Sequence, residues 1–357
     1  MSAAPGRPEE GSLPLRLTAQ SANGALKSEA VIELRDVSKQ FGPAPDAIAR
    51  FGVRMGWMKP PRVARAVDRV DLQFTRGEVV GLVGESGCGK STVGRMVAGI
   101  LRPSQGTMLY RGQSVDAMSA AAARQAKLKV QMIFQDPYGS LNPRKRVAQI
   151  IGEAPRVHGL IDGDFDAYVD AQLQRAGLDP AYKRRFPHEF SGGQRQRINI
   201  ARALAVDPEF LVCDEAVAAL DVSIQAQILN LFMDLREQLN LTYLFISHDL
   251  GVVRHLSDRV AIMYLGRIVE QAKAVEIFAR PNHPYTQALL SEVPRITARH
   301  RTFAAIRGEL PSPLRPPPGC HFHSRCPHAM PRCSQEAPVL REIAPGHHSA
   351  CHLNDSN

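Results

Sequence analysis

The chain has 357 residues, of which 44% are hydrophobic, 22% are charged and 6% are aromatic. These proportions are typical of a folded globular protein, and a length of about 150 residues per domain predicts two or three domains. No stretch of about 18 consecutive apolar residues occurs, and Glu9, Glu10 and Pro14 stand where a signal peptide needs an apolar segment. The composition therefore argues against a membrane-spanning or secreted protein.

The net charge is +9, from 44 basic and 35 acidic residues. This excess is compatible with a nucleic-acid partner, an anionic membrane surface or an ordinary solvated face. Nucleic-acid-binding surfaces often combine basic with aromatic residues, whereas this chain has few aromatic residues and no recognised nucleic-acid-binding motif. We therefore expect no nucleic-acid partner.

Composition divides the chain into three predicted regions. Residues 1–29 are rich in Ala, Gly, Pro and Ser without hydrophobic periodicity, which predicts a disordered leader. Residues 30–275 combine strand and helix patterns and predict an α/β domain, in which residues 136–190 predict an inserted helical subdomain. Residues 276–357 are rich in Pro, Cys and His and predict a loop-rich extension.

Short apolar runs indicate the strands of the α/β domain. The runs 79–83, 210–213 and 241–246 alternate with helical patterns, which is typical of a buried and mostly parallel sheet. Residues 31–41 alternate like a half-buried strand, and residues 67–84 predict a second strand pair.

A glycine-rich segment carries the strongest functional signal. Residues 84–91, GESGCGKS, fit the pattern G-x-x-x-x-G-K-[ST], follow an apolar run and lead into a helical pattern. Glycines let backbone N–H groups face phosphate oxygens, Lys90 adds a positive charge, and Ser91 offers a hydroxyl to Mg²⁺. A chance glycine-rich turn would not need an apolar run before it and a helical pattern after it. The predicted ATP-binding residues are Gly84, Glu85, Ser86, Gly87, Cys88, Gly89, Lys90, Ser91 and Thr92.

Polar residues follow three further apolar runs. Asp214 is expected to hold Mg²⁺ through water and Glu215 to orient the attacking water, although adjacent acids can also form a plain surface turn. Gln135 can ligate and sense Mg²⁺, and His248 can donate a hydrogen bond to the γ-phosphate, although each alone is compatible with an ordinary loop position. We predict a magnesium site of Ser91, Gln135 and Asp214 and a catalytic set of Glu215, His248 and Gln135.

The segment Ser191, Gly192, Gly193 and Gln194 resembles the signature of ABC ATPases. We call it the SGGQ segment. Ser191 and the two glycines open a helix whose N-terminus can bind an anion, although the chain already has one phosphate cradle. In the ABC family two such domains pair head to tail, and each signature closes over the ATP on the other's P-loop. A Ser-capped surface helix would explain the cap but not the ordered set of motifs.

The ordered motifs cover residues 31–270, and their order resembles that of the ABC family. The resemblance implies a RecA-like ATPase core with an antiparallel β subdomain and an inserted helical subdomain. It also implies that Phe41 stacks on adenine and that Asp221 belongs to a loop at the dimer contact. An aromatic residue near a strand end is more often part of the core, so Phe41 is the weakest member of the set.

Longer stretches resemble the ATP-binding subunits of oligopeptide/dipeptide ABC importers. These stretches are FQDPYGSLNPR, DEAVAALDVSIQAQILNL, SHDLGVVRHLSDRVAIMYLGRIVE, PNHPYTQALL and GELPSPLRPPPGCHFHSRCP. The block 50–65 resembles the second, F-type ATPase of the two paralogues in such systems. The resemblance implies a peripheral protein on the cytoplasmic membrane face. The implied partners are two permease subunits, a paralogous ATPase or a second copy, and indirectly an external solute-binding protein. A soluble ABC ATPase acting on nucleic acid or ribosomes is the alternative.

One position departs from the family pattern beside the predicted catalytic base. The family usually has DEPVSALD, whereas this chain has Ala216 and Ala218 in place of Pro and Ser. Without Pro the backbone at residue 216 gains freedom, so Glu215 would be held less rigidly. We therefore predict active but slower hydrolysis.

Four of the six cysteines lie in the extension with the spacing C-x5-C-x6-C-x17-C. In a reducing cytoplasm such a group is more often a metal or iron-sulfur site than a pair of disulfides. The spacing fits no standard zinc pattern, and reduced structural thiols are the alternative. The candidate ligands are Cys320, Cys326, Cys333 and Cys351.

Overall fold

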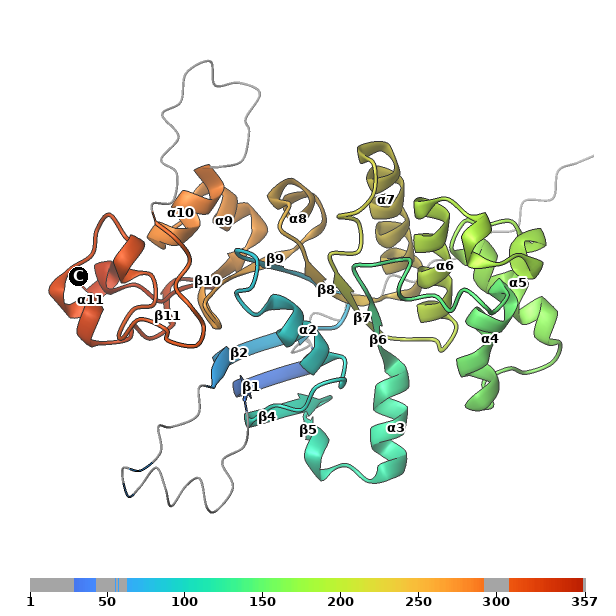
Figure 1. Cartoon of the computed structure of the whole chain (residues 1–357), viewed down its shortest axis with the longest axis horizontal. Helices are drawn as coiled ribbons and strands as arrows, with labels where there is room; N and C mark the ends of the chain where they lie inside the picture. Colours follow the sequence, from blue (N-terminus) through green and yellow to red (C-terminus); the bar gives the residue numbers. More distant parts are fainter. Residues whose placement is uncertain (1–28, 43–54, 56, 58–62, 292–307, 356–357) are drawn as a thin grey trace, which may run out of the picture.

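The protein contains two sheets with helices packed around the larger one (Figure 1). The computed structural model describes residues 29–42, 55, 57, 63–291 and 308–355. The predicted leader, apart from Glu29, and most of the block 50–65 lie outside the described residues.

The smaller sheet has four strands in the order β2-β1-β4-β5, all paired antiparallel. Its strands are β1 (Ala30–Phe41), β2 (Ala64–Thr75), β4 (Gln105–Tyr110) and β5 (Gln113–Ser114). The alternating pattern of β1 and β2 gives each strand one buried face, as its sequence predicts. This is the expected antiparallel β subdomain.

The larger sheet has eight strands in the order β11-β12-β10-β9-β3-β8-β7-β6. The pairs from β9 through β6 are parallel, and the pairs from β9 to β11 are antiparallel. The strands are β3 (Val79–Val83), β6 (Val130–Ile133), β7 (Phe210–Asp214), β8 (Thr242–Ile246), β9 (Arg259–Tyr264), β10 (Arg267–Lys273), β11 (Arg341–Ala344) and β12 (His347–Ser349).

The expectation of a strand pair within residues 67–84 is wrong. Both strands exist, but β2 pairs with β1 in the smaller sheet, whereas β3 lies between β8 and β9 in the larger one. The difference follows from burial. β3 is buried along its whole length and needs a neighbour on each side, whereas β2 alternates and suits an outer strand.

The described residues form ten helices. They are α2 (Lys90–Val97), α3 (Ala120–Lys129), α4 (Val147–Val157), α5 (Phe165–Arg175), α6 (Gly192–Leu204), α7 (Val222–Leu239), α8 (Leu250–Leu256), α9 (Ala274–Ala279), α10 (Pro284–Ser291) and α11 (Pro331–Gln335). Short 3-10 turns include η2 (Pro180–Arg184), η3 (Pro187–Glu189), η4 (His323–Arg325) and η5 (His352–Asp355). Helices α4, α5 and α6 contact one another at the end of the sheet next to β6. The boundaries of a helical subdomain at 136–190 stay a prediction.

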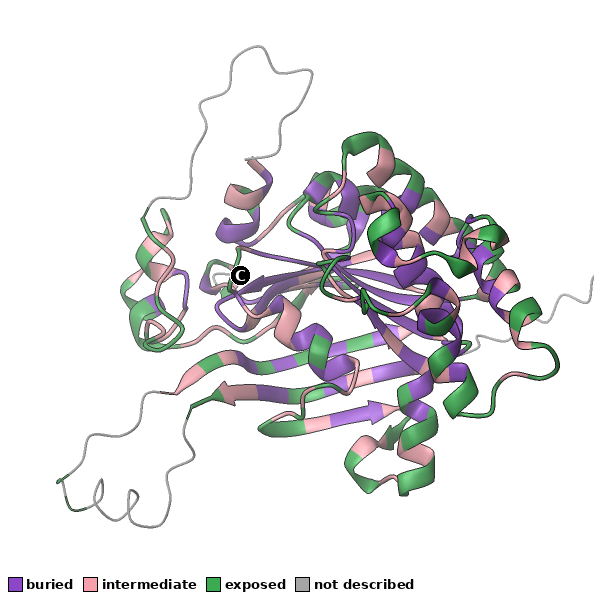
Figure 2. Cartoon of the chain, turned by 45° about the vertical axis from the view of Figure 1, so that its right-hand side comes forward, coloured by how far each residue is buried: buried purple, intermediate pink, exposed green. Residues whose placement is uncertain are grey.

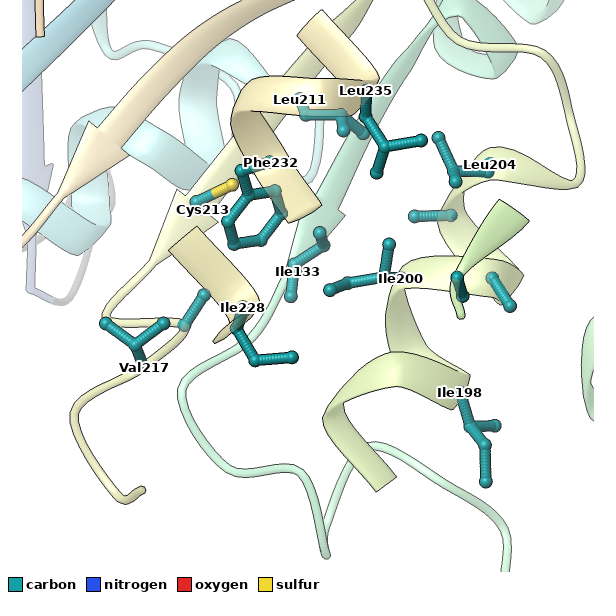
Figure 3. Packing of buried hydrophobic residues seen from close by; sticks show 14 of the residues in the cluster. Ile133, Ile198, Ile200, Leu204, Leu211, Cys213, Val217, Ile228, Phe232 and Leu235 are labelled. Atoms are coloured by element: carbon teal, nitrogen blue, oxygen red, sulfur yellow. The ribbon is translucent and has the colours of Figure 1, made fainter. Parts of the chain in front are cut away.

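The core lies on both faces of the larger sheet, where buried residues concentrate (Figure 2). On one face, Ile133 and Leu211 of the strands pack with Phe232 of α7 and Ile200 of α6 (Figure 3). On the other face, α2 fills the space between the two sheets, and its Met96 is completely buried. Burying each such side chain contributes about 2 kcal/mol, so both faces fix the strand ends that carry the polar residues.

The C-terminal extension continues the larger sheet. Strand β12 pairs with β10, and β11 pairs with β12. The fully buried carboxylate of Glu270, on β10, joins this strand to the extension because it accepts hydrogen bonds from the backbone N–H groups of Asn282 (2.8 Å) and His283 (2.9 Å). His347 Nε2 lies 2.7 Å from the same carboxylate. A buried charge with these partners is well satisfied and orders the start of α10.

Candidate functional site

The glycine-rich segment connects β3 to α2, as a P-loop requires. Gly89 has φ of +112° and stands directly before α2, a conformation that L side chains rarely adopt. A Cβ at Gly89 would lie 2.1 Å from the carbonyl oxygen of Ala66, and one at Gly84 would lie 2.1 Å from that of Met263. The loop therefore fits only with glycine at both positions.

Lys90 is buried and turns its ammonium into the loop. Its Nζ donates hydrogen bonds to the carbonyl oxygens of Gly84 (2.7 Å) and Glu85 (2.9 Å). Such a cation beside the N-terminus of α2 produces a positive potential that favours phosphate. Burial raises the pKa of the nearby Cys88 thiol, so it stays protonated at neutral pH and is inert.

Ser91 and Asp214 meet although they are far apart in the sequence. The Ser91 hydroxyl donates a hydrogen bond of 2.9 Å to Asp214 Oδ1 at the carboxyl end of β7. Burial raises the pKa of Asp214, and the hydrogen bond from Ser91 opposes that effect. Hydroxyl and carboxylate oxygens are the ligands that Mg²⁺ prefers, so the predicted magnesium roles of Ser91 and Asp214 are compatible with this geometry and stay a prediction. A cation there would favour the charged form of the carboxylate.

Glu215 lies at the centre of the predicted catalytic set. It has φ of +49°, and its N–H donates to the carbonyl of Ile246 at 2.9 Å, which holds the residue at the edge of the sheet. Gln135 Nε2 donates a hydrogen bond of 2.7 Å to Glu215 Oε2, and His248 Nδ1 lies 3.4 Å from Oε1. Residues that follow β6, β7 and β8 thus meet around one carboxylate. A strained backbone conformation of this kind is common in functional sites.

Comparison with known proteins identifies the family of this chain. Residues 67–218 match the family model "ABC transporter", and residues 269–333 match "Oligopeptide/dipeptide transporter, C-terminal region". The oligopeptide transport ATP-binding protein AppF of Bacillus subtilis is 49% identical over 334 residues, covering 92% of this chain and 99% of AppF. This chain is an ATP-binding protein of the ABC transporter family. Both the recognised family and the α/β ABC-type fold are thereby confirmed.

Solved structures of ABC ATPases share the fold. The cbiO1 protein of Clostridium perfringens, part of the ABC transporter complex cbiONQ, has a TM-score of 0.59 and 26% identity. The match covers 71% of this chain and 92% of cbiO1. None of the helices within the described residues combines the length and apolar character needed to cross a membrane.

The SGGQ segment opens helix α6 of this ABC ATPase. The Ser191 hydroxyl accepts a hydrogen bond from the N–H of Gln194 (3.3 Å), and the Gln194 side chain accepts one from the N–H of Ser191 (3.1 Å). This reciprocal capping leaves the backbone N–H groups of Gly192 and Gly193 available at the helix end. No hydrogen bond joins the segment to the P-loop within the described residues.

Two further residues of the expected set lie at exposed ends of elements. Phe41 ends β1 and is 42% exposed, with Lys39 Nζ 5.4 Å from its ring centroid. Asp221 stands before α7 and forms no side-chain cap hydrogen bond. Their adenine and dimer roles therefore stay predictions.

The P-loop also has two contacts that sequence reasoning missed. Glu85 N–H donates to the hydroxyl of Tyr285 at 2.9 Å, and Arg325 Nη1 lies 2.9 and 3.0 Å from the two Glu85 carboxylate oxygens. The partners are separated by 200 and 240 residues. No local sequence pattern predicts such contacts, and only covariation between the paired positions among homologues could reveal them.

The four cysteines of the extension lie within electrostatic range of one another, and all four are free thiols. Burial raises the pKa of Cys320 to about 11, and the other three thiols act in the same direction. Even so, no group of three or more Cys, His, Asp or Glu side chains in the described part of the chain is arranged to hold a metal ion. The arrangement as it stands does not fit the expected metal or iron-sulfur site.

The alanine beside the predicted catalytic glutamate gives a first prediction. Ala216 is 3% exposed and follows Glu215 directly in the turn after β7. Because Pro fixes φ, we expect Ala216→Pro to raise the rate constant kcat for ATP hydrolysis about two- to fivefold. Steady-state phosphate release measures this change, with Ala218→Ser as the matched control. An unchanged kcat in a folded Ala216→Pro protein would contradict the predicted slow turnover.

Proposed function

We propose that the protein is the ATP-hydrolysing subunit of an importer for di- and oligopeptides or related small solutes. The observation that carries this proposal is that Gln135, Glu215 and His248 meet after the carboxyl ends of β6, β7 and β8. The P-loop follows the carboxyl end of the parallel strand β3. The likeness to an oligopeptide transport ATP-binding protein over nearly the whole chain supports the peptide class. Nothing in the comparisons favours the soluble alternative acting on nucleic acid.

Each site residue has one part in the proposed hydrolysis. The backbone N–H groups of residues 84–91 bind the phosphates, and Lys90 moves its hydrogen bonds from loop carbonyls to the β- and γ-phosphate oxygens. Ser91, Asp214 and Gln135 would hold Mg²⁺, which neutralises phosphate charge when bound. Glu215 orients the attacking water and accepts its proton, and His248 donates a hydrogen bond to the γ-phosphate.

The SGGQ segment is proposed to serve a partner's ATP. Its free helix end can bind a phosphate, whereas the P-loop of the same chain already supplies one such cradle. We therefore infer a head-to-tail pair formed with a paralogous ATPase or a second copy, with Asp221 at the contact. Phe41 would stack on the adenine.

A segment after Gln135 is proposed to dock on the permease, and we call residues 138–147 the docking segment. Tyr138 is 65% exposed, and the guanidinium carbon of Arg195 lies 3.9 Å from its ring centroid, which connects the segment to α6. Because Gln135 precedes the docking segment and donates a hydrogen bond to Glu215, hydrolysis would move the segment. Two permease subunits, a peripheral position on the cytoplasmic membrane face and an external solute-binding protein follow from this role.

The docking segment gives the experiment that tests the proposed function. We expect Tyr138→Ala to lower peptide uptake by whole cells at least tenfold while basal ATP hydrolysis by the purified protein stays within about twofold, since a central aromatic anchor is lost from the interface. Val157→Ala, at the far end of α4 and also exposed, is the matched control. Unchanged uptake in the Tyr138 variant, or no dependence of uptake on this protein at all, would overturn the proposal.

The four extension thiols are the place that we propose for iron or zinc. Their proximity supports this assignment, whereas their geometry would have to change to ligate a metal. Iron and zinc contents of protein purified without oxygen decide between a metal group and four structural thiols.

A further inference from the structure

Glu85 is held at three points within the P-loop. Its N–H donates to the Tyr285 hydroxyl (2.9 Å), its carboxylate pairs with Arg325 (2.9 Å), and its carbonyl oxygen accepts from Lys90 Nζ (2.9 Å). Only the last contact comes from the P-loop itself. The other two come from α10 and from η4 of the C-terminal extension.

The two outside partners are themselves rigidly placed. Tyr285 and Tyr264 have ring centroids 4.7 Å apart, and Phe322, three residues before Arg325, packs edge-on against Tyr264 at 5.3 Å. Arg325 Nη1 also donates to the Tyr264 hydroxyl at 3.2 Å, and the Arg325 side chain is only 7% exposed. These rings form one buried cluster between β9, α10 and the extension. The guanidinium therefore has a fixed position beside the loop.

The charge of Glu85 makes this contact important for nucleotide binding. A carboxylate in a loop that cradles a polyphosphate repels it, and the carboxylate side chain is only 23% exposed, so water screens it incompletely. Arg325 neutralises this carboxylate from the side of the extension. Tyr285 fixes the neighbouring backbone N–H and so sets the path of the loop between β3 and Lys90.

We propose that Arg325 and Tyr285 are positioning residues through which the C-terminal extension sets the ATP affinity of the P-loop. This inference rests on the proposed role of the P-loop as the ATP site. Both residues bond to Glu85 of the P-loop, whereas Glu215 contacts Gln135 and His248. Their effect therefore falls on binding and not on the chemical step.

The test measures the dissociation constant Kd of a fluorescent ATP analogue, the KM and kcat for ATP, and the thermal midpoint Tm of full-length variants. We expect Arg325→Gln to raise Kd and KM about tenfold and to leave kcat at saturating ATP within about twofold, since an uncompensated carboxylate in the loop that binds the phosphates would repel them. Arg325→Lys retains the charge and should bind ATP within about threefold of wild type. Tyr285→Phe keeps the buried ring, loses the acceptor for Glu85 N–H, and should raise Kd about threefold.

Two comparisons separate positioning from general loss of structure. Arg332→Gln makes the same change on the same extension, where Arg332 pairs only with Glu336 and Asp355 among the described residues, and it should leave Kd unchanged. With Glu85→Gln already present, adding Arg325→Gln should change Kd less than twofold, because no carboxylate remains to neutralise. An equal loss in the Arg332 variant, a full tenfold loss in the Glu85→Gln background, or unchanged Kd in Arg325→Gln would overturn the inference. Wild-type protein that binds no ATP would instead refute the proposed function.

Discussion

Replacing Glu215 by Gln is expected to lower kcat for ATP hydrolysis at least about 100-fold while ATP binding is retained. The amide has nearly the same shape but cannot accept a proton from water, and a positioned general base contributes about 10²–10⁴ in rate. The Glu215 carboxylate contacts both Gln135 and His248, and no other carboxylate among the described residues contacts both of these residues. Phosphate release and nucleotide binding measured on the same preparation check both halves of the prediction.

The matched control for this change is Glu237→Gln, an exposed glutamate in the last turn of α7. It should hydrolyse ATP at the wild-type rate. Wild-type turnover by the Glu215 variant would show that another group activates water.

The Glu215 variant also serves to trap the closed ATPase pair in detergent extracts of native cells with ATP and Mg²⁺. Mass spectrometry then identifies the paralogue, a second copy and the permease subunits that are retained.

Replacing Lys90 by Ala is expected to weaken ATP binding at least about 100-fold. Lys90 is 5% exposed and its ammonium donates to the carbonyls of Gly84 and Glu85, so its loss removes the buried positive charge of the loop. Charge-assisted hydrogen bonds to phosphate in a partly desolvated pocket are strong enough for this effect. Titration with a fluorescent ATP analogue measures the affinity.

Lys127→Ala is the matched control, since Lys127 is exposed on α3 and contacts no P-loop residue among those described. Equal affinity of the Lys90 variant and wild type would contradict the phosphate role. Hydrolysis should fall with binding in the Lys90 variant. In the Glu215 variant, by contrast, only hydrolysis should fall, which distinguishes the two residues.

The sequence predicts the local parts of this site well because each motif carries its own physical context. The P-loop needs a strand before it and a helix after it, and both flank residues 84–91 in the structure. The polar residues Gln135, Glu215 and His248 each follow an apolar run, and parallel strands place such ends at one edge of the sheet. Their juxtaposition could therefore be inferred without coordinates.

Contacts between distant segments could not be inferred in this way. Arg325 lies in a loop-rich region where a single Arg has no distinguishing pattern, and Tyr285 looks like an ordinary core residue. The assignment of β2 and β3 to one pair failed for a related reason. Adjacency in the sequence favours pairing, but full burial of β3 demands two neighbours that come from much later in the chain.

The strand pairing between β10 and β12 has a consequence for any shortened form of the protein. Without β11 and β12, β10 would present an unsatisfied row of backbone N–H and C=O groups, and Glu270 would lose its His347 partner. Open strand edges invite self-association between chains. The extension thus covers the β10 edge of the larger sheet. Aggregation of a truncated protein would reflect this uncovered edge and not a lost transport function.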